Sequence, residues 1–211
     1  MQVLRRIVRT ALMAGIVTRL CFVPVLAGTL DANGNGGWTT EPGLDQPSYA
    51  VVEPRSRNLN IDVVVLACEQ ADDRRILQLQ LYLTNDGPLM PDGVEARRAK
   101  SHPRAEIAID DHVFPVGLLF AEDHVVLSDE THEAFPGLSA RLLDAMEEGT
   151  TMRLRFDLAA EPVGQPAAFD GEAVVDLQAG SAGMRGEAVA AVRRCATGTE
   201  PQTVALASPG R

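Results

Sequence analysis

The chain has 211 residues, of which 45% are hydrophobic and only 4% aromatic, and its formal net charge is −10. This length suits one domain or two small ones, and the hydrophobic fraction is too high for an intrinsically disordered chain. The acidic balance argues against binding to nucleic-acid phosphates or to anionic lipid, because both require clustered positive charge.

The first 27 residues have the three parts of a secretory signal peptide. Three arginines precede an apolar stretch over residues 10–28, and Val25-Leu26-Ala27 fits the small-residue rule for cleavage. We therefore predict cleavage after Ala27, with Ala32 as the second choice, and the periplasm or the medium as the destination. A retained membrane anchor is the alternative, and Arg19 disfavours it because a charge is costly within a bilayer span.

Cleavage would leave two cysteines, Cys68 and Cys195, because Cys21 belongs to the removed segment. It would also make the chain more acidic, since four arginines and no acid would be lost. Two cysteines in an exported protein predict one disulfide. Two free thiols or a redox pair are the alternatives, although the chain has no C-x-x-C motif to support thioredoxin-like chemistry.

Polar segments flank the predicted domain. Residues 28–47 are rich in Gly, Asn, Thr and Pro, so they have little apolar surface to bury and are expected to form a flexible linker. The same composition predicts a disordered tail over 197–211. Residues 48–196 remain as a single β-rich domain.

Period-two alternation predicts strands through the first two thirds of this domain. In residues 76–84 the leucines fall on one parity and the glutamines on the other, as in a half-buried strand. Asp110-Asp111-His112 predicts a hairpin turn, and Pro115 predicts an edge or bulge position for the strand that follows. The polar segment 88–104 is predicted to be a loop. The expected strands are 49–52, 61–67, 76–84, 105–110, 113–120, 125–127, 152–158 and 173–177.

Two segments change to helical periodicity. Residues 138–148 have apolar side chains at i, i+4 and i+8, begin near Ser139 and end before Gly149, which favours a helix stop. Residues 187–195 predict a short helix with two valines on its apolar side.

This order of elements predicts an α+β fold: an antiparallel β-rich sheet or sandwich with one mid-chain helix and a short C-terminal helix. No long crossover helices separate the early strands, which disfavours a parallel sheet. Cys68 at a strand end and Cys195 on the last helix would attach that helix to the sheet.

The run LLDAMEEGTTMRLRFDL, followed by FDGEAVVDL and EAVAAVRRC, resembles the C-terminal part of small exported bacterial proteins. The invasion-associated locus B family is one such group. The resemblance implies an envelope protein in which a helix, a strand and a Cys-bearing helix follow a β-rich start. It assigns no functional residue, and this chain lacks the family's usual extra cysteines.

Residues 122–133 contain two histidines and five carboxylates. Neutral imidazole and carboxylate oxygen bind zinc, manganese and similar divalent ions. The spacing matches no known ligand pattern, and a solvated acidic loop is the competing interpretation. The candidate metal ligands are Asp123, His124, His132 and Glu133, with His112 expected to approach from a neighbouring strand.

No catalytic motif is found in the sequence. The segment around Ser139, GLSAR, departs from G-x-S-x-G, and no Gly-rich loop has P-loop or dinucleotide spacing. We therefore expect a small, acidic, exported protein without cofactor or catalytic residues, with a binding or structural role and an envelope protein or small molecule as partner. The alternative is a metal-binding protein or metal-dependent hydrolase that uses the loop at 122–133.

Overall fold

The computed structural model describes residues 37–41, 47–72, 74–85, 87–132, 135–178 and 186–197, except the side chains of Thr131 and His132. The predicted signal peptide and most of the predicted tail lie outside these residues, as does Glu133. No helix among the described residues is long and apolar enough to cross a membrane.

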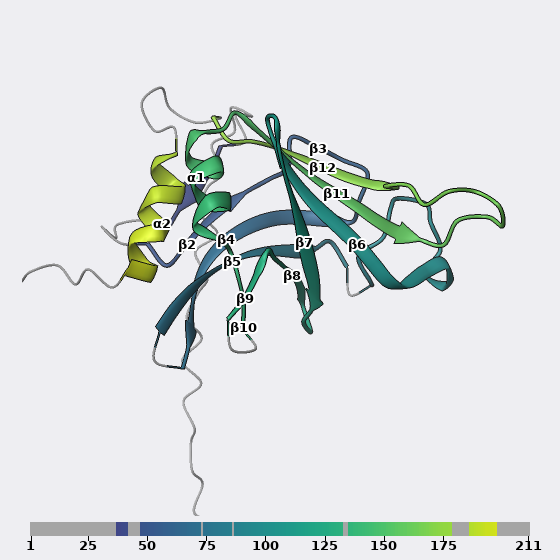
Figure 1. The fold of residues 1–211 in the computed structure, drawn as a ribbon, viewed down its shortest axis with the longest axis horizontal. Helices are drawn as coiled ribbons and strands as arrows, with labels where there is room; N and C mark the ends of the chain where they lie inside the picture. The colour runs from purple at the N-terminus through teal and green to yellow at the C-terminus, as the bar shows by residue number, and fades with distance from the viewer. Residues whose placement is uncertain are drawn as a thin grey trace, which may run out of the picture. The chain divides into compact units, whose positions relative to one another are not determined.

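The described residues form twelve strands, two α-helices and one 3-10 helix (Figure 1). The strands are β1 (Thr39–Thr40), β2 (Tyr49–Val52), β3 (Ser56–Arg57), β4 (Ile61–Ala71), β5 (Arg74–Leu83), β6 (Ala99–Ile109), β7 (His112–Phe120), β8 (His124–Ser128), β9 (Glu130–His132), β10 (Phe135–Gly137), β11 (Thr151–Ala159) and β12 (Gly171–Asp176). The helices are η1 (Ala96–Arg98), α1 (Ala140–Glu148) and α2 (Glu187–Thr197).

Ten strands form one antiparallel sheet in the order β1-β2-β4-β5-β8-β7-β6-β11-β12-β3, and β9 pairs with β10 apart from it. The sheet curls into a half-barrel (Figure 1). Val52 of β2 pairs with β4 near one end of the sheet, and Ser56 of β3 pairs with β12 at the other end. These residues are four positions apart, a span of at most about 14 Å. The two ends of the sheet must therefore approach each other.

The inner side of the curl holds the core, as the predicted alternation requires. On β11, Met152, Leu154 and Phe156 are fully buried, and the leucines of β5 face the same core. The apolar faces of α1 and α2 pack against this cluster. The predicted fold class, strand-rich with one mid-chain helix and one C-terminal helix, is confirmed.

The ends of α1 follow the predicted signals. Ser139 is the N-cap, and its hydroxyl accepts a hydrogen bond from the Leu142 N–H at 3.1 Å. Asp129 in turn accepts hydrogen bonds from the Ser139 N–H, at 2.7 Å, and from its hydroxyl. At the other end, a Cβ on Gly149 would lie 2.4 Å from Ile109. Close packing against β6 therefore requires glycine at the helix end.

The loop predicted over 88–104 is too long. The strand β6 begins at Ala99 and pairs with β11. Its register shifts between Asp157 and Ala159 of β11, so the part of β6 that contains Pro103 lies opposite this irregularity. The polar composition of this segment is typical of a loop, but Lys100 and Arg104 form ion pairs with Asp157 of β11.

Pro115 lies on an inner strand of the sheet at a position that is locally an edge. Among the described residues, β7 pairs with β8 over Gly117–Phe120, whereas its pairing with β6 covers His112–Val116. At Pro115, β7 therefore has a paired neighbour on one side, which suits a residue that has no N–H. The edge prediction holds locally but is wrong for the strand as a whole.

The glutamines of β5 are buried although they lie on the face of the strand that points away from the core leucines. Gln78 and Gln80 are 8% and 4% exposed. The side chain of Gln78 donates a 2.8 Å hydrogen bond to the Pro136 carbonyl in β10, and that of Gln80 donates a 3.0 Å bond to Glu69. The strand is therefore buried on both faces, because β10 covers the face that the alternation assigned to solvent.

Candidate functional site

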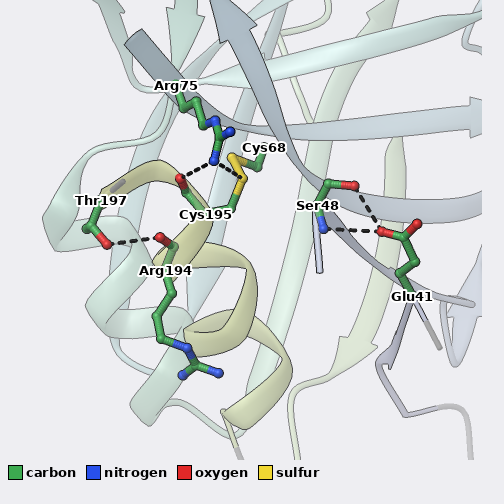
Figure 2. The surroundings of a disulfide bond; sticks show 7 residues. All are labelled: Glu41, Ser48, Cys68, Arg75, Arg194, Cys195 and Thr197. Atoms are coloured by element: carbon green, nitrogen blue, oxygen red, sulfur yellow. Dashed lines mark hydrogen bonds between the residues drawn. A yellow bond between two sulfur atoms is a disulfide. The ribbon is translucent and has the colours of Figure 1, made fainter. Parts of the chain in front are cut away.

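A disulfide joins Cys68 on β4 to Cys195 on α2 (Figure 2). The two residues are 127 positions apart in the chain, and their Cα atoms are 6.3 Å apart. The predicted pairing is confirmed. The bond attaches the last described helix to the sheet.

The sequence periodicity places both sulfur atoms between the same two elements. Val189, Val192 and Cys195 follow one another at intervals of three and are the buried residues of α2. Cys68 comes two residues after the buried Leu66 of β4, so it points to the same side of the sheet. The disulfide therefore lies within the contact between α2 and the inner side of the half-barrel.

The two cysteines have different polar surroundings (Figure 2). A terminal nitrogen of Arg75 on β5 lies 3.3 Å from the carbonyl oxygen of Cys195 and 3.7 Å from its sulfur. On the other side, the Cys68 N–H donates to the Ser48 carbonyl at 2.8 Å. The Ser48 backbone N–H and hydroxyl donate to the Glu41 carboxylate, at 3.4 and 3.1 Å. A cation thus contacts Cys195, whereas the polar chain beside Cys68 ends in a carboxylate.

The helix α2 is also attached to α1 by an ion-pair network. Arg193 donates to Asp144 at 2.6 Å and to Glu147 at 2.9 Å. Hydrogen bonds to Glu147 and Asp144 raise the pKa of Arg193. Disulfide, apolar contacts and ion pairs therefore all hold α2 in place.

The structure brings two of the predicted metal ligands together. At the start of β8, Nδ1 of His124 lies 2.7 Å from the Asp123 carboxylate, and the imidazole stacks on the Tyr82 ring at 5.3 Å between centroids. The hydrogen bond with His124 lowers the pKa of Asp123. The pair leaves Nε2 of His124 as the nitrogen that a metal would bind.

The other two predicted ligands cannot be placed at this pair. His132 is the last residue of β9, but its side chain is not described, and Glu133 lies outside the described residues. Within the described part of the chain, no group of three or more His, Cys, Asp or Glu side chains is arranged to hold a metal ion. The metal site stays a prediction.

His112 lies far from His124. It begins β7, whereas His124 begins β8, and the two strands are antiparallel with Phe120 opposite Val125. At about 3.3 Å per residue, the two histidines are separated by roughly 25–30 Å along the strands. The hairpin places the two strand starts at opposite ends, so His112 cannot share a metal ion with His124. The side chains of His132 and Glu133 lie outside the described part of the chain, so an approach of His112 to them stays a prediction.

A depression of about 330 Å³ lies beside the part of β7 that pairs with β6 but not with β8. Its walls include Val113, Pro115, Asp129 and Arg141. The Arg141 guanidinium lies 5.3 Å from the centre of the Phe114 ring, a cation–π distance. The depression thus offers a cation and an apolar wall, while Asp129 already accepts the N-cap hydrogen bonds of α1.

An ion-pair cluster around the buried Asp157 of β11 was not predicted. Asp157 is 1% exposed and accepts hydrogen bonds from Lys100 and from Arg104, the latter at 2.6 and 2.9 Å. Lys100 also donates to Glu161 at 2.7 Å. Hydrogen bonds to Asp157 and Glu161 raise the pKa of Lys100, and its hydrogen bond lowers the pKa of Glu161. The available signal was that Lys100 is the single lysine of an arginine-rich chain.

Comparison with known proteins gives no match: no protein-family model, curated protein or solved structure matches this chain. The similarity to the invasion-associated locus B family therefore stays a prediction.

Proposed function

We propose that this chain is an exported, non-catalytic protein of the periplasm or the medium that binds a partner or has a structural role. The observation that carries the proposal is the Cys68–Cys195 disulfide. Structural disulfides persist in oxidising compartments and are rare in the cytosol. The signal-peptide pattern over residues 1–27 supports the same destination.

Two carboxylates in the described part of the chain already hold hydrogen bonds or ion pairs within the fold, which supports a non-catalytic role. Asp129 accepts the N-cap bonds of Ser139, and Asp157 accepts from two cations. A general acid or base needs a titratable group that faces space for a substrate. These two carboxylates instead hold secondary structure together.

Export is tested with the full chain carrying a C-terminal tag in a bacterial host with a periplasm. Fractionation should place the tagged protein outside the cytosol, and sequencing of its N-terminus should begin at Gly28. Its mass without reduction should be lower by two hydrogen atoms than after reduction. A matched variant without residues 2–27 should stay in the cytosol. Full-length protein in the cytosol with three titratable thiols, from Cys21, Cys68 and Cys195, would contradict the proposal.

The Asp123–His124 pair favours one alternative, a divalent-metal site. A carboxylate that holds one imidazole nitrogen is a common arrangement behind a metal-bound histidine. Elemental analysis of the purified chain tests it. A stoichiometric metal that is lost in the variant His124→Ala/His132→Ala would favour the metal site. Metal-free protein that keeps its fold after incubation with zinc or manganese would exclude it.

A further inference from the structure

The two cysteines of the disulfide differ in the exposure of the whole residue and in the charge beside it. Cys195 is 8% exposed, whereas Cys68 is partly buried. Arg75 reaches the Cys195 side of the bond, with a guanidinium nitrogen 3.7 Å from its sulfur (Figure 2). The charge on this arginine is permanent, because a guanidinium does not lose its proton in proteins.

Thiol–disulfide exchange discriminates between two such sulfur atoms. An incoming thiolate attacks one sulfur, and the other leaves with the bonding electron pair as a thiolate. A neighbouring arginine stabilises a thiolate and lowers the pKa of its thiol, and a thiol of lower pKa leaves faster. At this bond the arginine favours Cys195 as the leaving group and Cys68 as the attacked atom.

We propose that Cys68–Cys195 is a directional exchange site whose reaction partner is a small thiol such as glutathione or the exposed thiolate of a dithiol oxidoreductase. The incoming sulfur forms a bond with the Cys68 sulfur, the Cys68–Cys195 bond breaks, and Cys195 leaves as a thiolate next to Arg75. A second thiolate, from another glutathione molecule or from the other cysteine of the oxidoreductase, then attacks the partner's sulfur in the mixed disulfide. The bond to Cys68 breaks, the partner is released as a disulfide, and Cys68 leaves as a thiolate. Each protein thiolate takes a proton from water to become a free thiol.

The exchange would free α2 from its covalent attachment to β4. The remaining described attachments of the helix include the buried Val189 and Val192, the bonds from Arg193 to α1 and the hydrogen bond from Arg75 to the Cys195 carbonyl. All of these contacts are non-covalent, so exchange would leave the helix without a covalent bond to the sheet. The site would thus control how firmly the last described helix covers the core.

The test uses the purified oxidised chain with a limiting amount of reduced glutathione at neutral pH. Acid quenching, alkylation of free thiols and peptide mass spectrometry locate the first glutathione. We expect it on Cys68 in most singly modified molecules, with the alkyl group on Cys195. Glutathione mainly on Cys195, or equally on both cysteines, would overturn the proposal. Equal labelling is the result expected of an unfolded chain, because it exposes both sulfur atoms alike.

Three variants assign the direction to Arg75. Arg75→Gln should slow exchange roughly three- to tenfold and weaken the preference for Cys68, because the leaving thiolate loses its cation. Arg75→Lys should restore part of both. Arg57→Gln is the matched control and should change neither, because it removes an exposed arginine from β3, which pairs with β12 and not with β4 or β5. An unchanged rate and site distribution in Arg75→Gln would refute the role of Arg75.

These measurements are made on purified protein and do not depend on its location in the cell. Failure of the exchange test would leave the export proposal standing. Likewise, a cytosolic location would contradict the export proposal but not the direction of exchange, which the glutathione-labelling experiment decides by itself.

Discussion

Two groups of strands in the same sheet bury outward-facing side chains against different partners. On β4, β5 and β8, the buried outward residues are apolar or amide side chains, including Val65, Gln80 and Val126. On β6 and β11, the buried outward residue is Asp157, which lies between Lys100 and Arg104. We call the first set of strands the amide side and the second set the ion-pair side.

The difference follows the distribution of basic residues along the chain. No lysine or arginine occurs between Arg104 and Arg141, a segment that supplies β7 and β8. The segment supplies no lysine or arginine of its own, and the buried outward residues of β8 are apolar. The strands β6 and β11 place opposite charges at facing positions, with Arg104 opposite Asp157 and Glu106 opposite Arg155. The two sides should therefore respond differently to reductant and to acid, and this can be measured.

The largest effect is expected from removing the disulfide of the amide side. The double variant Cys68→Ser/Cys195→Ser should lower the free energy of unfolding by about 4–5 kcal/mol, because so long a loop is no longer closed in the unfolded chain. Denaturant unfolding of oxidised wild type, reduced wild type and the variant measures it. A loss below about 1 kcal/mol would show that α2 is held by its non-covalent contacts alone.

The next largest effect is expected on the ion-pair side. Asp157→Ala removes the carboxylate that two cations share, and we expect a loss of about 2–3 kcal/mol in the free energy of unfolding. Glu172→Ala is the matched control, since its pair with Arg153 is exposed at both partners. That control should lose less than about 1 kcal/mol. Equal losses in the two variants would remove the distinction between buried and exposed pairs.

A smaller, pH-dependent effect is expected at the β6–β7 turn. Asp110 has a φ of 48° and accepts hydrogen bonds from the Thr150 hydroxyl, at 2.5 Å, and from the Thr150 and Thr151 N–H groups. These bonds, that of the Thr150 hydroxyl first, lower the pKa of Asp110 below its ordinary value of 3.8. A lowered folded-state pKa gives stability that is present above pH 3.8 and is lost as the pH falls through the folded-state pKa.

Asp110→Asn should therefore cost about 1 kcal/mol at neutral pH, and the difference from wild type should shrink in acid. Asparagine tolerates the left-handed backbone conformation, so the variant isolates the charge and its hydrogen bonds. Unfolding midpoints measured from pH 7 to pH 2 check it. Asp111→Asn, one residue along the same turn, is the control for loss of one negative charge. A difference that persists unchanged at pH 2 would contradict the assigned cause.

The smallest effect is expected from Gln78→Leu on the amide side. Loss of the bond to the Pro136 carbonyl should cost about 0.5–1 kcal/mol, partly offset by the added apolar contact. Thermal unfolding at neutral pH and at low pH measures it, and the cost should be the same at both. A marked pH dependence would show that Gln78 is coupled to a titrating group.

The regular elements of this fold could be predicted because their residues repeat. The buried faces were indicated directly by leucines at every second position of β5 and by apolar residues at every fourth position of α1. The strands β1, β3, β9 and β10 have two or three residues each, which is too short to show a period. The meeting of the sheet ends depends on pairing between distant segments, on which local patterns carry no information.

The same reasoning explains the outcome at the candidate site. The number of cysteines predicted the disulfide, but Arg75 reaches it only because the β4–β5 hairpin places Gln70 opposite Arg75. The alternation along β11 correctly predicted that Asp157 points outward. No local pattern indicated that Lys100 covers it there. For the metal ligands, the Asp123–His124 contact is between chain neighbours, whereas any contact with His132 depends on the β9–β10 hairpin.

The short outermost strands have a consequence for association between molecules. The edges of a sheet expose unpaired N–H and C=O groups and can template fibrous aggregates. Here the two terminal strands of the described sheet, Thr39–Thr40 and Ser56–Arg57, have only two residues each. Each therefore offers an incoming chain too little backbone to register against. This favours a protein that remains dispersed at high concentration despite its long, apolar inner strands.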